Sequence, residues 1–256
     1  MKLVNRIRLF RLNAAALRTL GMVFAMCGLA AVWIRQILLG GGSLTNSELL
    51  DAMQTSPEVM TYATITLVFQ VLEACAVPVF AFLLVEGVGH ARGFGRYFLG
   101  ILGTAVLCQL PYNVLMTGSL LMIRGLNPAF ALVMSLVMLY FFRRFPEKSA
   151  SHILIKAFAL VFAFLWSNLL GVSHGAACVI LTAVLWALRG KQNLQTFLGI
   201  AVAMACSVFD LFYMASPLAF LLIHFYDPEG WSRSRTADHL AYPVCLLIFS
   251  VLVKVM

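Results

Sequence analysis

The chain has 256 residues, of which 62% are hydrophobic and only 11% are charged. A typical soluble domain has about 25% charged residues, so this composition excludes an ordinary water-soluble enzyme. The formal net charge is +8, but the basic residues occur in short clusters between apolar stretches and form no continuous face for nucleic acid. The composition therefore predicts an all-α, polytopic membrane protein whose partner is the lipid bilayer and not a nucleic acid.

The apolar stretches predict a single transmembrane domain over residues 1–256, with about eight helices that cross the bilayer. A basic lead over residues 1–16 precedes the first span, which we expect from Leu17 to Leu39 as a retained anchor. A polar loop over residues 43–60 follows. The other well-defined spans are expected at Tyr62–Gly87, Tyr97–Met116, Ala129–Phe142, Ile153–Gly171, Ala176–Leu188 and Leu240–Val255.

The apolar stretch from Thr196 to Tyr226 is too long for one crossing. As a single helix it would measure about 46 Å, whereas the hydrocarbon core of a bilayer is about 30 Å thick. Ser216-Pro217 is a helix-breaking pair. We therefore expect one span and a re-entrant or interfacial segment, with the break near Pro217.

The positions of the basic residues predict the orientation, because cytoplasmic loops are enriched in Lys and Arg. With the N-terminus inside and alternating spans, most basic residues fall inside, and the outside holds only Arg35, Arg124, Arg233 and Arg235. The acidic residues Asp227, Glu229 and Asp238 also fall outside. This pattern predicts a membrane protein with both termini in the cytoplasm.

Two acidic residues fall within apolar spans, where a charge costs on the order of 3 kcal/mol. Glu73 lies near the middle of the second span, and Pro78 follows it and frees a backbone carbonyl nearby. Asp210 lies in the broken stretch, with Ser207 and Tyr213 one helical turn away. Each acid is either a neutral carboxyl bonded to another helix or a group that faces water or substrate.

Glu86 and His90 are four residues apart at the end of the second span, a spacing that places both side chains on one helical face. A carboxylate can hold an imidazole in one tautomer and leave its other nitrogen as a general base. The alternative is an interfacial pair that ends the helix.

The remaining polar candidates are less specific. Tyr112 and Asn113 form a polar notch with Gln109, which is typical of contacts between membrane helices. His174 and His239 are expected at the outer face, where they could meet His224. Their spacing is not that of metal ligands, and none of the six cysteines forms a CxxC pair, so no metal is predicted.

The second and third spans resemble the TraX family. The run from Val77 to Gly87 reads V-P-V-F-A-F-L-L-V-E-G, and His90, Tyr97 and Pro111-Tyr112 follow it. That family has an F-P-x-F-x-F block, then E-G with a His close behind, a span that begins with Tyr, and a Pro-aromatic notch. Weaker likeness is found at Leu17-Arg18, at Tyr226 to Gly230 and at Ala241-Tyr242-Pro243.

The resemblance implies a membrane acyltransferase in the bacterial inner membrane, because the TraX family is associated with acetylation of conjugative pilin. The donor would be acetyl-CoA or another acyl-CoA, and the acceptor a surface or secreted protein or glycan. His90 would act as the base with Glu86 beside it, and Arg92 and Arg96 would bind the donor phosphates. Glu73, Asp210, Tyr112, Asn113, His174 and His239 are the further candidates for substrate binding.

The chain departs from the family pattern at three places. Gly28 and Leu29 stand where the family has Asp-His, Glu73-Ala74 where it has Gly-Arg, and Cys245 where it has a His. Two alternatives to an acyltransferase therefore remain. One is a catalytically inactive membrane scaffold, and the other is a transporter that uses Glu73 and Asp210 to bind a proton or a solute.

Overall fold

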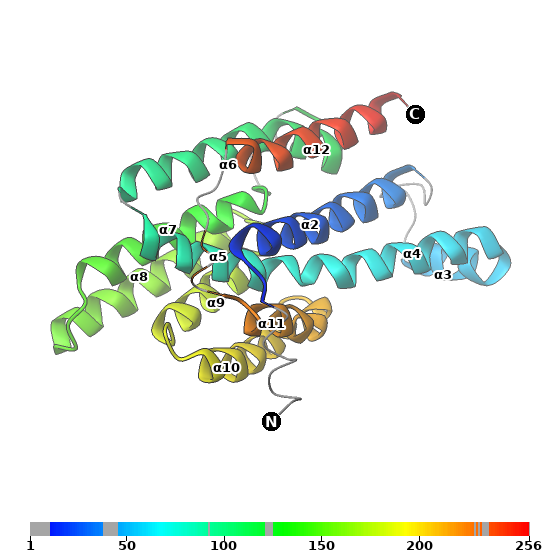
Figure 1. Ribbon diagram of the computed structural model, residues 1–256. Helices are drawn as coiled ribbons and strands as arrows, with labels where there is room; N and C mark the ends of the chain where they lie inside the picture. The colour runs from blue at the N-terminus through cyan, green and yellow to red at the C-terminus, as the bar shows by residue number, and fades with distance from the viewer. Residues whose placement is uncertain are drawn as a thin grey trace.

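The computed structural model describes residues 11–37, 46–91, 93–120, 125–227, 229, 231 and 236–255, and the helices in this part of the chain form an all-α bundle (Figure 1). The helices are α2 (Ala14–Ile37), α3 (Asn46–Thr55), α4 (Pro57–Ala74), α5 (Ala76–His90), α6 (Phe94–Thr117), α7 (Ala129–Arg144), α8 (Ala150–Leu169), α9 (Gly175–Ala187), α10 (Gln192–Ala205), α11 (Pro217–His224) and α12 (Thr236–Val255). The 3₁₀ turns η1 (Cys206–Val208) and η2 (Leu211–Ala215) separate α10 from α11.

Among the described residues, four stretches are long and apolar enough to cross a membrane, namely Ala14–Gln36, Pro57–His90, Phe94–Thr117 and Ala150–Leu169. They match four of the predicted spans, as expected of a membrane protein. Other apolar helices are shorter: α9, with 13 residues, is only about 20 Å long. The count of eight crossings is therefore not confirmed, and α9 is instead packed inside the bundle against α5, α7, α8 and α10.

Helix α5 lies at the centre of the bundle, where twelve of its fifteen residues are buried. It packs on α2, α7, α9 and α11. The sequence of α5 is apolar on all sides, as expected of a helix that is surrounded by protein. His90 is thus the last residue of this enclosed helix, and the helix that carries Glu73 directly precedes it.

A proline at the start of α5 leaves a backbone carbonyl without its usual helical partner. Pro78 has no N–H to donate to the carbonyl of Ala74, four residues earlier. The hydroxyl of Ser216, which is fully buried, donates to this carbonyl oxygen at 3.3 Å. The broken segment after α10 is therefore bonded directly to the junction between α4 and α5.

The stretch from 192 to 227 folds as a re-entrant hairpin. Thr196 Oγ1 in α10 lies 3.1 Å from Nδ1 of His224 at the end of α11, so both ends of the segment lie at one end of the bundle. The break predicted near Pro217 is confirmed, since α11 begins there, but α10 already ends at Ala205. α10 and α11 go in and return together, so the expected separate span is not confirmed.

This return changes the predicted side of the chain after α11. Leu12 and Tyr226 form a β-bridge, and Arg11 Nη1 lies 3.0 Å from Asp227 Oδ2. Asp227 therefore lies beside the start of α2 and not across the membrane from it, which corrects the sequence prediction. We call this end of the bundle the His90 end, because His90 stacks on Trp231, four residues after Asp227, with ring centroids 4.7 Å apart.

Helix α12 runs away from the His90 end. Tyr242, Phe249 and Val253 follow one another along α12 and pack on the cluster that Leu29, Cys108, Tyr112, Leu115 and Leu246 form. Figure 1 shows the end of α12 beside the end of α2. The start of α2 and the end of α12 thus lie at opposite ends of the bundle, whereas the side of the membrane on which each terminus lies stays a prediction.

We expect Ser216→Ala to destabilise the protein by about 1–3 kcal/mol, because the buried carbonyl of Ala74 would lose its donor. The measurement is the unfolding midpoint in detergent. The matched background is Pro78→Ala, in which the backbone N–H of residue 78 can bond to Ala74 and the Ser216→Ala change should cost much less. An equal cost in both backgrounds would show that Ser216 does not serve this carbonyl.

Candidate functional site: a cavity between two acid–histidine clusters

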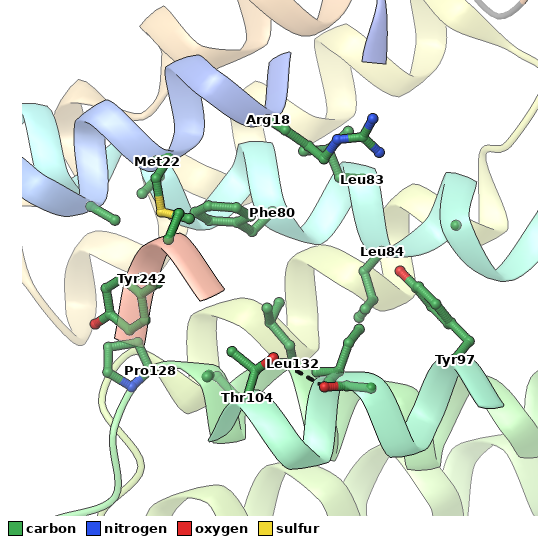
Figure 2. Close-up of a pocket in the computed structure, with 18 of the residues that line it drawn as sticks. Arg18, Met22, Phe80, Leu83, Leu84, Tyr97, Thr104, Pro128, Leu132 and Tyr242 are labelled. Atoms are coloured by element: carbon green, nitrogen blue, oxygen red, sulfur yellow. Dashed lines mark hydrogen bonds between the residues drawn. The ribbon is translucent and has the colours of Figure 1, made fainter. Parts of the chain in front are cut away.

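A cavity of about 1730 Å³ lies between α2, α5 and α6 (Figure 2). Arg18 on α2 and Tyr97 on α6 lie toward one end of it, and Tyr242 on α12 lies toward the other. The wall between them is mostly apolar and includes Met22, Phe80, Leu83, Leu84 and Leu132. Polar groups are therefore concentrated at the ends of an apolar chamber, an arrangement typical of ligand sites.

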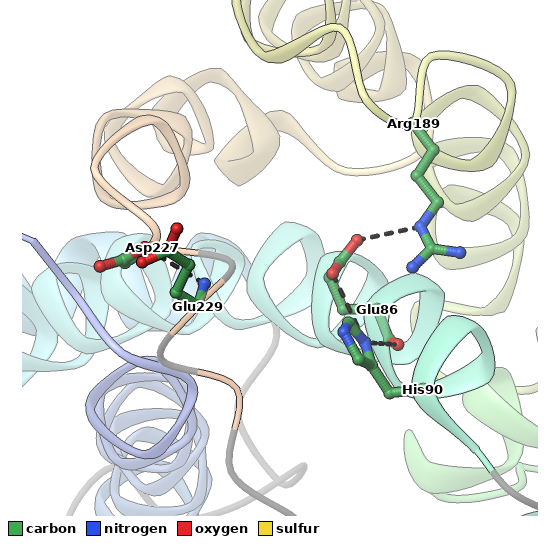
Figure 3. Close-up of polar contacts among 5 residues, drawn as sticks. All are labelled: Glu86, His90, Arg189, Asp227 and Glu229. Atoms are coloured by element: carbon green, nitrogen blue, oxygen red, sulfur yellow. Dashed lines mark hydrogen bonds and ion pairs between the residues drawn. The ribbon is translucent and has the colours of Figure 1, made fainter.

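The first polar cluster contains Glu86, His90 and Arg189 (Figure 3). His90 Nδ1 lies 2.9 Å from the carbonyl oxygen of Glu86 and 3.8 Å from its carboxylate, so the predicted pair is brought together. Arg189 Nε lies 3.2 Å from the other carboxylate oxygen of Glu86. No local sequence pattern indicates Arg189 as a site residue, because 103 residues separate Arg189 from Glu86 and only the fold joins the two.

The backbone contact of His90 determines its tautomer. The carbonyl oxygen of Glu86 can only accept a hydrogen bond, so Nδ1 carries the proton and donates it. Nε2 is then left unprotonated with a lone pair. Because His90 also lines the cavity, this ring has the properties that a general base requires.

Two glycines at the end of α5 allow the cluster to form. A Cβ at Gly89 would collide with the guanidinium of Arg189, and a Cβ at Gly87 would collide with the hydroxyl of Tyr97. The helix continues through both glycines to His90, so they do not break it, and they leave room for the side chains of Tyr97 on α6 and of Arg189 just after α9.

Tyr226 lies near the first polar cluster. Burial raises the pKa of the Tyr226 phenol to about 12, and the charge of Glu86 adds to this shift.

The second polar cluster contains Glu73, His174 and Tyr213. His174 Nε2 lies 3.5 Å from Glu73 Oε1, and its Nδ1 lies 2.7 Å from the Tyr213 hydroxyl. Both Glu73 and His174 line the cavity. His174 caps α9 with a φ of 58°, a left-handed conformation that is uncommon for residues other than glycine, and this places its ring toward α4. The sequence predicted Glu73 and His174 as candidates, but not Tyr213 and not the contact between them.

Position 28 provides the space that Glu73 occupies. A Cβ at Gly28 in α2 would collide with the carboxylate of Glu73. Gly28 and Glu73 are both interpreted from the sequence as departures from the family pattern, and the structure brings these two positions into contact.

Several predicted residues have other roles. Asp210 caps η2 by accepting a hydrogen bond from the backbone N–H of Phe212 at 3.1 Å, and it is not part of the cavity wall. Tyr112 contacts the hydroxyl of Ser173 at 2.5 Å, and Asn113 bonds to Gln109 and to the carbonyl of Leu120. These contacts join α6 to the loops before α7 and α9. They favour a structural role for Tyr112 and Asn113 over a role in substrate binding.

The three outer histidines do not form the expected group. His174 lies with Glu73, whereas His224 lies at the His90 end beside Thr196. The side chain of His239 and the whole of Arg92 lie outside the described residues. Arg96 lines the cavity near His90. Within the described part of the chain, no three His, Cys, Asp or Glu residues are placed to hold a metal ion.

The long apolar helices indicate a membrane protein of the α-helical class, with a re-entrant hairpin and an apolar cavity that has polar groups at its ends. The chain belongs to the TraX family, because the model of that family, described as TraX protein, matches residues 49–253. The matched range includes the block from Val77 to His90 and leaves out α2 with Gly28. No curated protein and no solved structure matches the chain.

We expect a double-mutant cycle of Glu73→Gln and His174→Asn to give a coupling energy of about 0.5–3 kcal/mol, because the two groups are in contact inside the bundle. In a Gly28→Ala background the coupling should fall, since the added methyl group displaces the carboxylate. The measurement is unfolding in detergent.

The matched control is the pair of Glu147 and His152, which is also separated by 3.5 Å but has a Glu147 side chain that is 73% exposed. Its coupling should stay below about 0.5 kcal/mol. Similar values for both pairs would contradict a structural link between Glu73 and His174.

Proposed function

We propose that this protein transfers an acyl group from an acyl-CoA donor to an amine or a hydroxyl group of a surface or secreted acceptor. Membership of the TraX family supports the reaction class. The observation that carries the assignment of the base is the geometry of His90, whose Nδ1 is held by the Glu86 carbonyl and whose Nε2 is left as a proton acceptor on a ring that lines the cavity.

The charges at the His90 end support a cytoplasmic position for this cluster. Arg189 bonds to Glu86, Arg143 donates to the carbonyl of Val88 at 3.3 Å, and Arg11 pairs with Asp227. Arg18 and Arg96 line the adjacent cavity. Because Lys and Arg are enriched on the cytoplasmic side of membrane proteins, this end faces the compartment that contains acyl-CoA.

The reaction follows from these positions. The acceptor nitrogen or oxygen attacks the thioester carbonyl carbon while His90 Nε2 takes its proton. The tetrahedral intermediate then loses the C–S bond, and the CoA thiolate leaves and receives that proton from His90. Glu86 stabilises the positively charged imidazolium from 3.8 Å, and Arg189 holds the carboxylate in place. Arg96, together with Arg92, binds the donor phosphates.

Replacing the base should reduce turnover. We expect His90→Ala to lower the rate of acyl-CoA consumption by about 10²–10⁴-fold, the range typical for a general base. The assay follows release of free CoA by purified protein with an amine acceptor. His152→Ala, which changes a histidine outside the cavity, should keep the wild-type rate, and equal rates in wild type and His90→Ala would overturn the assignment.

Arg96→Gln tests the donor site separately. We expect it to raise KM for acyl-CoA by about tenfold with little change in kcat, since a phosphate contact contributes equally to the ground state and the transition state. A drop in kcat with an unchanged KM would place Arg96 in the chemical step and not in donor binding.

One observation favours a second function, transport of a proton or a cation, because Glu73 is a carboxylate in the wall of a cavity inside a membrane protein. The cap that Asp210 forms on η2 gives this residue a structural role and leaves Glu73 as the group for transport. Proteoliposomes should then show pH-dependent uptake that Glu73→Gln abolishes. If wild-type vesicles show no uptake, the transporter is excluded.

A further inference from the structure

The side of the cavity between α2 and α6 faces outward. Helix α2 packs mainly on α4 and α5, whereas α6 packs mainly on α12 and α7, and α2 and α6 contact each other only weakly. Val23 on α2 and Leu99 and Leu107 on α6 belong to the cavity wall, and they are 48%, 66% and 59% exposed. In a protein whose α2 and α6 cross the bilayer, this opening leads to lipid chains and not to water.

The far end of the same cavity is closed. Tyr242 of α12 lines the cavity, and its neighbour Leu246 is fully buried against Leu29 of α2 and Cys108 of α6. Beyond it, Gln36 of α2 donates to the carbonyl of Met116 of α6 at 3.1 Å. The two helices thus meet at this end and diverge toward the His90 end, so the cavity is a slot that is open along the bilayer.

The polarity of the slot falls from its His90 end to its apolar middle, and the Glu73–His174 cluster lies beyond that middle. Arg18 in the second turn of α2 and Arg96 in the first turn of α6 lie at its His90 end, at the depth where helices meet the membrane surface. Met22, Phe80 and Leu83 follow toward the interior (Figure 2). Arg18 also lies over the ring of Trp231 at 5.9 Å. A molecule that fits this gradient has an anionic head group and an apolar chain.

We propose that the acceptor is a phosphate-bearing membrane lipid that enters between α2 and α6. Its phosphate lies at Arg18, its apolar chain lies against Met22, Phe80 and Leu107, and a hydroxyl or amine of its head group is placed at Nε2 of His90. This inference rests on the proposed function for the acyl transfer itself. It accounts for a chamber of about 1730 Å³, far larger than an acetyl group needs, and for an opening at the depth of the acyl chains.

The binding step can be tested without any enzyme assay. The full-length protein is reconstituted into vesicles that contain phosphatidylglycerol with a diazirine in one acyl chain, and the cross-linked residues are mapped by mass spectrometry after irradiation. We expect labelling of α2 and α6 around Met22 and Leu107 to exceed labelling of the exposed face of α8 around Phe158 and Leu165. Uniform labelling of all exposed helices would overturn the proposal.

Two substitutions from opposite walls fill the slot. A Cβ at Gly103 of α6 meets nothing within 4 Å, so Gly103→Trp should fold and occupy the space, and Thr19→Trp does the same from α2. Each should remove the excess labelling of α2 and α6 and leave α8 unchanged. Leu165→Trp on α8 is the matched control, and it should leave the excess labelling of α2 and α6 and the labelling of α8 unchanged. Excess labelling that persists in both filled variants would contradict a lipid in the slot.

The head group is tested with the same chain on two lipids. Arg18→Gln should lower slot labelling by the phosphatidylglycerol probe about fivefold, as expected for one basic residue near an anionic lipid. Labelling by a phosphatidylcholine probe should stay unchanged. Equal losses with both probes would show that Arg18 does not select an anionic head group.

The outcomes separate this inference from the proposed function. If the slot is labelled as expected but no acyl-CoA is consumed with lipid or amine acceptors, the acyl transfer fails and the lipid site stands. If the wild-type protein transfers the acyl group to a soluble peptide amine but not to phosphatidylglycerol, the transfer stands and the lipid acceptor is wrong.

Discussion

The carbonyl of Ala74, which has no helical partner, links the junction between α4 and α5 to the hairpin of α10 and α11. Pro78 cannot donate to the carbonyl of Ala74, and in an apolar interior an unsatisfied carbonyl is costly. The hydroxyl of Ser216 donates to this carbonyl, and Ser216 belongs to the hairpin that α10 and α11 form. The hairpin therefore has to reach the centre of the bundle, and its return brings Tyr226 and Asp227 to the start of α2.

The same junction sets the distance between the two acid–histidine clusters. Glu73 lies just before the break and His90 lies at the end of α5, so seventeen residues, or about 25 Å of helix, separate them. They cannot act on the same bond. A long cavity with a polar cluster near each end is thus a property of one nearly continuous helical stretch, Pro57–His90, that passes through the middle of the protein.

Local sequence patterns predicted the long helices and the contact between Glu86 and His90, because both depend on residues within a few turns of one helix. The contact of Glu73 with His174 and that of Glu86 with Arg189 depend on how distant helices pack, which no local pattern records. The predicted position of Asp227, across the membrane from the start of α2, was wrong for a related reason. Counting crossings assumes that each apolar stretch passes through the membrane, and composition does not distinguish a hairpin that turns back at residues 206–216 from a helix that continues.

The glycines beside the charged groups make the cavity sensitive to changes that leave every polar residue intact. Gly28 faces Glu73, Gly89 faces Arg189 and Gly87 faces Tyr97, and in each case a methyl group would occupy the space of the partner's polar atoms. A relative that keeps all the acids and histidines but carries alanine at these positions would have a differently shaped chamber. In this protein, the small residues opposite the polar ones therefore determine the shape of the chamber as directly as the polar residues do.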